Sequence, residues 1–339
     1  KGCKIIAEGT QNLPIVFTSN ESVGNRAEGD WGGLVILGQA TNNQPGGVAN
    51  IEGIVPTANT QYGGTNDNDN SGILKYVRIE FAGIALEPNK EINGITFGSV
   101  GRGTQVDFVQ VSFSGDDSYE WFGGTVDCKH LIAYRGIDDD FDTDFGYRGR
   151  IKFGLIIRDN TMYDAAGDSN GLESDNDAAG SANTPQTAAI FSNLTIIGAK
   201  GNGSLSLPAG EKFEKAFRIR RNSSISVFNS LIVGWEKGLS IEGPSCENNV
   251  TSGTLVFSNN VLTELPLGAS YVTATTVFFS PIALVNDTTT SVNQIKWINA
   301  FPSLGVAPDC RLDSTSLVST GADFTNAKFV GGFVGVNEI

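Results

Sequence analysis

A short motif that alternates apolar and acidic residues occurs three times between residues 115 and 177. Each copy begins with a large apolar residue, at Tyr119, Phe141 and Leu172. An acidic residue follows directly in each copy, at Glu120, Asp142 and Glu173. Because successive side chains of a strand point to opposite faces, the motif predicts three strands with apolar residues on one face and acids on the other.

The same pattern extends the repeat beyond these three copies. Matching segments begin upstream at Ile95 and downstream at Phe217 and Leu239. The shorter intervals are 22 or 24 residues, and the longest, from Leu172 to Phe217, contains segments rich in Gly, Asn and Ser at 176–185 and 198–210. The outward positions then form one column, made of Thr96, Glu120, Asp142, Glu173, Arg218 and Ser240. A repeat of this length, with one supersecondary unit per copy, is typical of a solenoid.

A second group of strands alternates with the copies of this motif. Its members are rich in Val, Ile and Phe and end in Gly or a polar turn, at 76–83, 108–115, 130–136, 155–157, 194–198 and 231–234. Inward apolar residues from both groups predict two parallel sheets around one core, and helical periodicity is missing. We therefore expect an all-β fold, a parallel β-helix with about 22–24 residues per rung and long loop insertions.

We expect one domain that spans residues 1–339. Residues 42–72 form a long polar excursion from the repeat. Residues 266–339 keep strand character but lose the clean period, so we interpret them as late rungs and a C-terminal cap. The chain opens at once on strand-like sequence without a visible cap or signal peptide. We therefore expect the start of the full-length protein, with its export signal, to lie upstream.

The composition fits turn-rich β structure and favours cations as ligands. The chain has 42 Gly, a single His and a formal net charge of −14, with the acids concentrated at 115–177. Such a surface repels nucleic acid and anionic lipid, so we expect no DNA or RNA partner. One His disfavours a His-rich metal site, and the longest apolar runs, such as 34–38, are too short to cross a bilayer.

The four cysteines are far apart in the sequence, at Cys3, Cys128, Cys246 and Cys310. They form no CxxC pair, which disfavours a zinc site and a thioredoxin-type redox site. Cys246 and Cys310 share the loop-rich C-terminal part, where a disulfide is one interpretation and buried free thiols are the other.

Several long strings resemble a family of secreted or surface proteins common in Bacteroidetes and related bacteria. The strings include GDWGGLVILG, YGGTNDNDNSGILKYVRIEFAGIAL, DDSYEWFGGTVDCKHLIAYRGIDDDFDTDFGYRG and the closing TGADFTNAKF, and they cover nearly the whole chain. The resemblance implies export, often by lipoprotein or type IX secretion signals, and a right-handed parallel β-helix similar to pectate lyases. It implies no activity, because the members are mostly uncharacterised.

The outward acids allow three interpretations. One is a calcium site, because hard cations bind several carboxylate oxygens and neighbouring rungs lie about 5 Å apart. Its candidate ligands are Asp142, Asp144, Glu173 and Asp175. Another is glycoside hydrolysis, which needs two carboxyl groups about 5 Å or about 6.5–9.5 Å apart. The last is a solvated acidic face that Arg218 and Arg220 balance in charge.

Phe122 follows the same alternation and is predicted to point outward beside the acids, whereas Trp121 points inward. An exposed ring beside carboxylates can stack on a sugar face, and the alternative is that a loop, such as the insertion at 159–190, covers it. The candidate ligand-binding residues are Glu120, Phe122, Asp142, Asp144, Glu173, Asp175, Arg218 and Arg220. None of them is assigned a catalytic role.

Together these patterns predict an exported, monomeric β-helix protein at the cell surface or outside the cell. Its expected role is binding, adhesion or surface architecture, with extracellular glycans as partners and calcium as the one cofactor considered. The alternative is a polysaccharide lyase or glycoside hydrolase that uses the acidic column.

Overall fold

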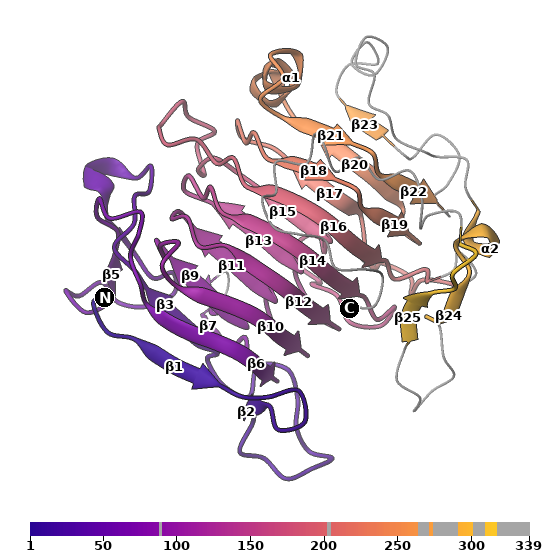
Figure 1. Ribbon diagram of the computed structural model, residues 1–339, viewed down its shortest axis with the longest axis horizontal. Coiled ribbons are helices and arrows are strands. Elements are labelled where there is room, and N and C mark those ends of the chain that lie inside the picture. Colours follow the sequence, from indigo (N-terminus) through magenta and orange to yellow (C-terminus); the bar gives the residue numbers. More distant parts are fainter. Residues whose placement is uncertain (88–89, 202–204, 264–270, 274–290, 301–308, 317–339) are drawn as a thin grey trace.

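Two parallel β-sheets face each other across one core in the computed structural model of the chain (Figure 1). The structure describes residues 1–87, 90–201, 205–263, 271–273, 291–300 and 309–316. Through the repeat, strands of the two sheets alternate along the chain, so each turn adds a rung to both sheets. This arrangement is a parallel β-helix, and it confirms the predicted fold class.

The eleven-stranded sheet contains the second group of strands predicted from the sequence. Its members are β1 (Ile5–Glu8), β2 (Ile15–Phe17), β6 (Gly72–Glu80), β10 (Gln105–Ser112), β12 (Cys128–Tyr134), β14 (Arg150–Ile157), β16 (Ile190–Ile197), β18 (Ser226–Phe228), β19 (Leu231–Val233), β21 (Val256–Ser258) and β22 (Val261–Thr263).

The eight-stranded sheet contains the acidic motif. Its members, in sequence order, are β3 (Leu34–Leu37), β9 (Ile95–Gly98), β11 (Tyr119–Phe122), β13 (Phe141–Asp144), β15 (Leu172–Ser174), β17 (Lys215–Ile219), β20 (Lys237–Ile241) and β23 (Tyr271–Thr273).

The remaining elements are short and lie in the insertions and the C-terminal part. They are the antiparallel pairs β4 (Ala49–Asn50) with β5 (Gln61–Tyr62), β7 (Ala85–Glu87) with β8 (Lys90–Glu91) and β24 (Trp297–Asn299) with β25 (Asp309–Leu312), the helices α1 (Pro244–Thr251) and α2 (Val292–Ile295), and a 3₁₀ turn at Pro45–Gly47. No helix in the described part of the chain has the length and apolar character needed to span a membrane.

The register of the eight-stranded sheet matches the register read from the sequence. Tyr119 pairs with Phe141, and the column continues through Leu172 and Phe217 to Leu239. All five side chains are fully buried, with an exposed fraction of 0%. The pairing of Leu172 with Phe217 survives the long insertion between them, because the inserted residues leave the rung as loops.

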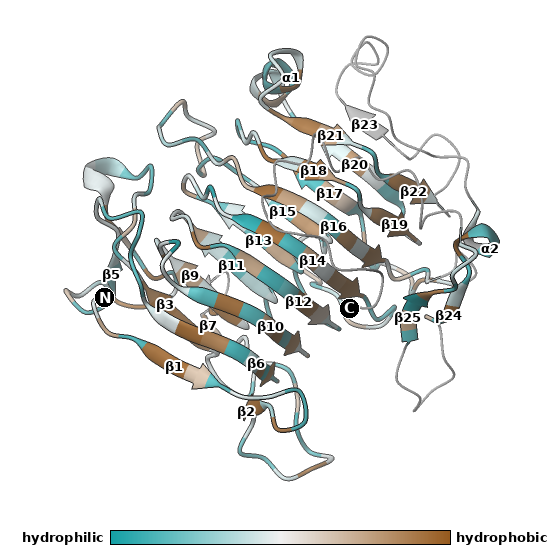
Figure 2. Ribbon diagram, viewed as in Figure 1, coloured by the Kyte–Doolittle hydropathy of each residue, from teal (hydrophilic) through white to brown (hydrophobic). Residues whose placement is uncertain are grey.

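Aromatic rings fill the core between the two sheets. The indole of Trp121 stacks on Phe97 at 5.7 Å between centroids and on Tyr147 at 5.6 Å. Phe141 meets the Trp121 ring edge-on at 5.7 Å. Figure 2 shows hydrophobic and hydrophilic residues alternating along the stacked strands, as the two-residue period of a strand requires.

A column of left-handed residues bends the strands of the eleven-stranded sheet. Tyr76, Phe108, His130 and Phe153 have φ between 50° and 62°. Their rings stack in this order, with centroids 4.5, 4.2 and 5.0 Å apart. Left-handed backbone is costly for such residues, and the stacked rings offset part of that cost. His130 is therefore a packed residue of the scaffold.

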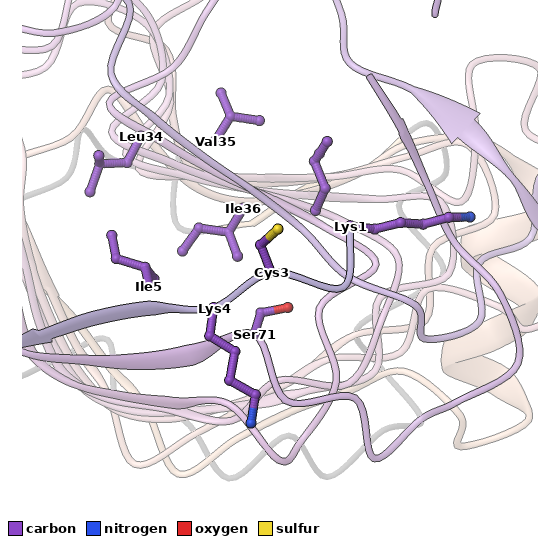
Figure 3. Close-up of a pocket in the computed structure, with 9 residues that line it drawn as sticks. Lys1, Cys3, Lys4, Ile5, Leu34, Val35, Ile36 and Ser71 are labelled. Carbon is purple, nitrogen blue, oxygen red and sulfur yellow. The ribbon is translucent and has the colours of Figure 1, made fainter. Parts of the chain in front are cut away.

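The first strands of the two sheets enclose a hollow at one end of the β-helix. It measures about 300 Å³ and is lined by Lys1, Cys3, Lys4, Ile5, Leu34, Val35, Ile36, Leu37 and Ser71 (Figure 3). The acids of the repeated motif lie further along the helix, on β11, β13 and β15. The hollow is thus separate from the acidic motif.

The structure describes three short segments of the C-terminal part, at 271–273, 291–300 and 309–316. β23 adds a late rung to the eight-stranded sheet by pairing with β20. Trp297 and Cys310, from the pair β24–β25, pack against Ile197 and Val233 of the eleven-stranded sheet. All four cysteines are free thiols, which favours the second of the two interpretations of Cys246 and Cys310. The strings at 275–284 and 320–335 lie outside the described residues.

Candidate functional site

Three columns made mostly of polar residues run along the eight-stranded sheet. The central column is the predicted outward one, and its members pair in register from Thr96 to Ser240. The column before it lies two positions ahead of each strand's first apolar residue and contains Asn93, Asp117, Asp139, Asn170 and Lys215. The column after it contains Phe122, Asp144, Asp175 and Arg220. We call the carboxylates of β11, β13, β15 and their flanks, namely Asp117, Glu120, Asp139, Asp142, Asp144, Glu173 and Asp175, the acidic face.

Backbone-to-side-chain hydrogen bonds hold the first of these columns in register. The N–H of Asp139 donates to Asp117 Oδ1 at 2.9 Å. The N–H of Asn170 donates to Asp139 Oδ1 at 2.6 Å. Each carboxylate therefore accepts a bond from the next rung, and this bonding places the first column beside the central one.

Three overlapping groups of carboxylates bring their oxygens together. In each group, one oxygen per residue lies within 4.8 Å of the others. The groups are Asp116 with Asp117 and Asp138, Asp117 with Glu120 and Asp142, and Asp139 with Asp142 and Glu173. Asp117 and Asp142 each belong to two groups, so they link the three groups into one cluster.

Most of the acidic face is covered, whereas Asp142 and Asp144 are half-buried, and this contradicts the interpretation of a solvated face. The exposed fraction is 6% for Glu120, 8% for Glu173 and 5% for Asp175. Asn93 of the first column donates a hydrogen bond to Glu120. Asn43, in the loop after β3, donates to the backbone oxygen of Asn176 at 2.7 Å, so this loop contributes to the cover. The sequence pattern located the column, but not the loops that fold over it.

Burial and mutual repulsion raise the pKa of these carboxyl groups. Burial, followed by repulsion from Asp138, raises the pKa of Asp139 to about 8. Burial, followed by repulsion from Asp139, raises the pKa of Glu173 to about 8, against the attraction of two arginines. Burial and the charges of Glu120 and Glu173 hold the pKa of Asp142 well above its usual range. The acidic face thus resists carrying its full negative charge when nothing neutralises it.

Arginines of β17 and its end neutralise one side of the acidic face, as the sequence predicted. Arg218 Nη1 lies 3.3 Å from Glu173 Oε2, and Arg220 Nε lies 2.9 Å from Asp175 Oδ1. Arg220 also pairs with Glu173, and Arg221 with Asp175 at 2.7 Å. These contacts confirm that the arginine rung lies next to β15 despite the insertion.

The predicted metal ligand set is only half assembled. Asp142 and Glu173 share a group with close oxygens, but Asp144 and Asp175 belong to none of the groups found among the described residues. Arg220 and Arg221 occupy Asp175, and Asp144 Oδ1 accepts the N–H of Phe145 at 2.6 Å. Of the four predicted ligands, Asp142 and Glu173 are thus the two whose oxygens lie close together.

Two residues of the acidic face and one neighbour of it were missing from the sequence-based candidates. Asp117 and Asp139 contribute carboxylates, and Asn170 lies on the rung after Asp139. They lie two positions before the matched residues Tyr119, Phe141 and Leu172. The same register arithmetic applied to these flanking positions would have found them.

Phe122 is a buried aromatic residue, with 4% of its surface exposed, and this corrects its expected role as an open platform. Its ring packs against Tyr62 at 6.3 Å and Phe145 at 5.1 Å between centroids. The alternative, that a loop covers the ring, is confirmed. The covering residue Tyr62 belongs to the excursion at 42–72, not to the insertion at 159–190.

A family model described as a pectate-lyase-like β-helix domain matches residues 1–301 of the chain. No curated protein matches the chain, and no solved structure does. The matched region includes every residue of the acidic face. The match agrees with the observed fold, and its description assigns no ligand or reaction to the acidic face.

Proposed function

The chain belongs to the pectate-lyase-like β-helix family, and we propose that it is an exported, non-catalytic binding module whose ligands bind at the clustered carboxylates Asp117, Glu120, Asp139, Asp142 and Glu173 of the acidic face. The face takes calcium ions, and extracellular glycans bind beside them. The module works outside the cell or at its outer surface. This role uses the crowded carboxylates without requiring a chemical step.

The observation that carries the proposal is a group of carboxylates without counter-ions. Asp117, Glu120, Asp139 and Asp142 form no ion pair with any residue that the structure describes. Their oxygens approach one another within 4.8 Å in the overlapping groups. Like charges this close in a buried environment repel strongly, and a hard divalent cation both relieves the repulsion and uses the oxygens as ligands.

The geometry favours binding over glycoside hydrolysis. Hydrolysis places a sugar between two carboxyl groups about 5–9.5 Å apart, with room for water in the inverting case. Here, carboxylate oxygens of neighbouring rungs lie within 4.8 Å of each other, which fits the shorter of these separations, but Glu120, Glu173 and Asp175 are buried, so a sugar has little access to them. The ring of Phe122 is also covered and offers no sugar platform.

One observation favours a second candidate, a polysaccharide lyase or hydrolase. Glu173 has a pKa raised to about 8 and lies against Arg218 and Arg220. A carboxyl group that keeps its proton at neutral pH can serve as a general acid. Catalysis at this position needs a substrate to reach Glu173 past the covering loops.

The two candidates separate in one experiment on the parent protein and an Asp142→Asn/Glu173→Gln double variant. Thermal unfolding is followed with calcium and with a chelator, and both proteins are incubated with uronic-acid and neutral polysaccharides. The control is a Glu28→Gln/Asp313→Asn variant, which removes two charges from exposed positions outside the face.

We expect calcium to stabilise the parent and the control but not the double variant, and none of the three to cleave polysaccharide. Cleavage by the parent that the double variant loses overturns the binding module in favour of the enzyme. If calcium has no effect on the parent, the acidic face is structural and the proposed function fails.

A further inference from the structure

Two consecutive rungs carry four neighbouring oxygen-bearing side chains, namely Asp139, Asp142, Asn170 and Glu173. Asp142 of β13 pairs in register with Glu173 of β15. Asp139 and Asn170 stand three positions ahead of them on the same rungs, joined by the 2.6 Å bond from the Asn170 N–H to Asp139 Oδ1. The carboxylate oxygens of Asp139, Asp142 and Glu173 lie within 4.8 Å of one another.

Asn170 supplies a second, independent indication of a ligand. Its exposed fraction is 0%, and its Oδ1 has no hydrogen-bond partner in the described part of the chain. Its Nδ2 donates to the backbone oxygen of Asp168 at 3.2 Å and to Glu173 Oε2 at 3.5 Å. The backbone oxygen of Asp168 can only accept, so turning the amide over would lose this bond, and Oδ1 remains an acceptor without a partner.

A buried carbonyl oxygen without a partner is costly, and native proteins rarely leave one. Asp142 Oδ1 is in the same condition, buried and without a partner among the described residues. Both oxygens belong to the four side chains named above. One positive ion between the two rungs would satisfy both at once.

We propose that a calcium ion binds between β13 and β15 with Asp139, Asp142, Glu173 and the amide oxygen of Asn170 as its protein ligands. This inference rests on the proposed function and gives the position of its cation site. Asp144 and Asp175 are not ligands of this site.

The charge and the ligand chemistry select the ion. Asp139 and Asp142 have no ion-pair partner in the described residues, whereas Glu173 shares its charge with Arg218 and Arg220. Two unpaired carboxylates match one divalent cation. Four oxygen ligands without nitrogen or sulfur suit a hard ion, and calcium tolerates the irregular geometry that magnesium does not.

Four protein ligands leave coordination positions open, because calcium takes about 6–8 oxygens. Water or the hydroxyl and carboxylate oxygens of a glycan complete the shell. The site therefore gives the binding module a direct way to hold an oxygen-rich ligand at the covered face.

The test is calcium titration by calorimetry of the full chain and four single variants, with the melting temperature of each measured in chelator. Asp139→Asn and Asn170→Ala each remove one proposed ligand, whereas Asn170→Asp keeps an oxygen there. Asp144→Asn is the matched control, because Asp144 is an acid of the same face that is not among the four proposed ligands. The melting temperature in chelator reports any purely structural role of the substituted side chain.

We expect Asp139→Asn and Asn170→Ala to weaken calcium binding about 10-fold or more. Asn170→Asp should retain binding, and Asp144→Asn should change the affinity by less than about 2-fold. If Asn170→Ala does not fold, the contrast between Asp139→Asn and Asp144→Asn decides. Calcium binding that survives Asp139→Asn, or that Asp144→Asn abolishes, overturns this site and leaves the proposed function standing. If the parent binds no calcium, both fail.

Discussion

The stability of the protein without calcium should fall as the pH rises from 5 to 7. Burial and neighbouring acids raise the pKa of Asp139 and of Glu173 to about 8, from ordinary values of 3.8 and 4.5. At a pH between these ordinary values and about 8, the folded protein holds protons that the unfolded chain has released. Because the folded state binds more protons, raising the pH favours unfolding in this window.

The size of the effect follows from the number of protons retained. Each retained proton lowers the free energy of unfolding by about 1.4 kcal/mol per pH unit. Asp139 and Glu173 repel each other, so we count one proton for the pair, which amounts to about 3 kcal/mol between pH 5 and 7. Calcium replaces protons at these oxygens and should flatten the dependence.

The assay is denaturant unfolding at pH 5, 6 and 7 in chelator and in calcium. An Asp139→Asn/Glu173→Gln variant, which removes both titrations, serves as the control and should show a weaker dependence in chelator. A free energy of unfolding that stays constant or rises from pH 5 to 7 in chelator would refute the assignment of raised pKa values to the acidic face.

Two further predictions concern the core and the arginine rung. Phe141→Ala should lower the free energy of unfolding by about 3–5 kcal/mol, because the ring is fully buried in the core column, and a loss below about 1 kcal/mol in denaturant unfolding would contradict the packing. Replacing Arg218 and Arg220 together by Gln removes the ion pairs of Glu173 with these two arginines. The double variant should therefore bind calcium more tightly, or be less stable because the buried Glu173 is left unpaired. If calorimetry and denaturant unfolding both leave the double variant unchanged, the ion-pair ladder is wrong.

The register of the β-helix could be predicted because the apolar positions recur with the rungs. The pairing of Leu172 with Phe217 was found across 45 residues, since inserted loops leave the rung without changing its order. The same register placed Arg220 beside Asp175. Alternation and spacing in the sequence thus predict which side chains stack on neighbouring strands.

The cover of the acidic face could not be predicted from the repeat. Tyr62 reaches Phe122 from the excursion at 42–72, whose path depends on tertiary contacts and not on the period. Asp139 and Asn170 precede their strands, outside the alternating segments from which the candidates were taken. Burial then changed the chemistry, because it raised the pKa of carboxyl groups that a solvated face would have kept ionised.

The most direct test of the calcium-binding face is a structure determined with the protein saturated in calcium. We predict an ion between β13 and β15 with oxygens of Asp142 and Glu173 at about 2.3–2.6 Å. An ion bound only away from the eight-stranded sheet, or an acidic face without an ion at saturating calcium, would contradict the proposal.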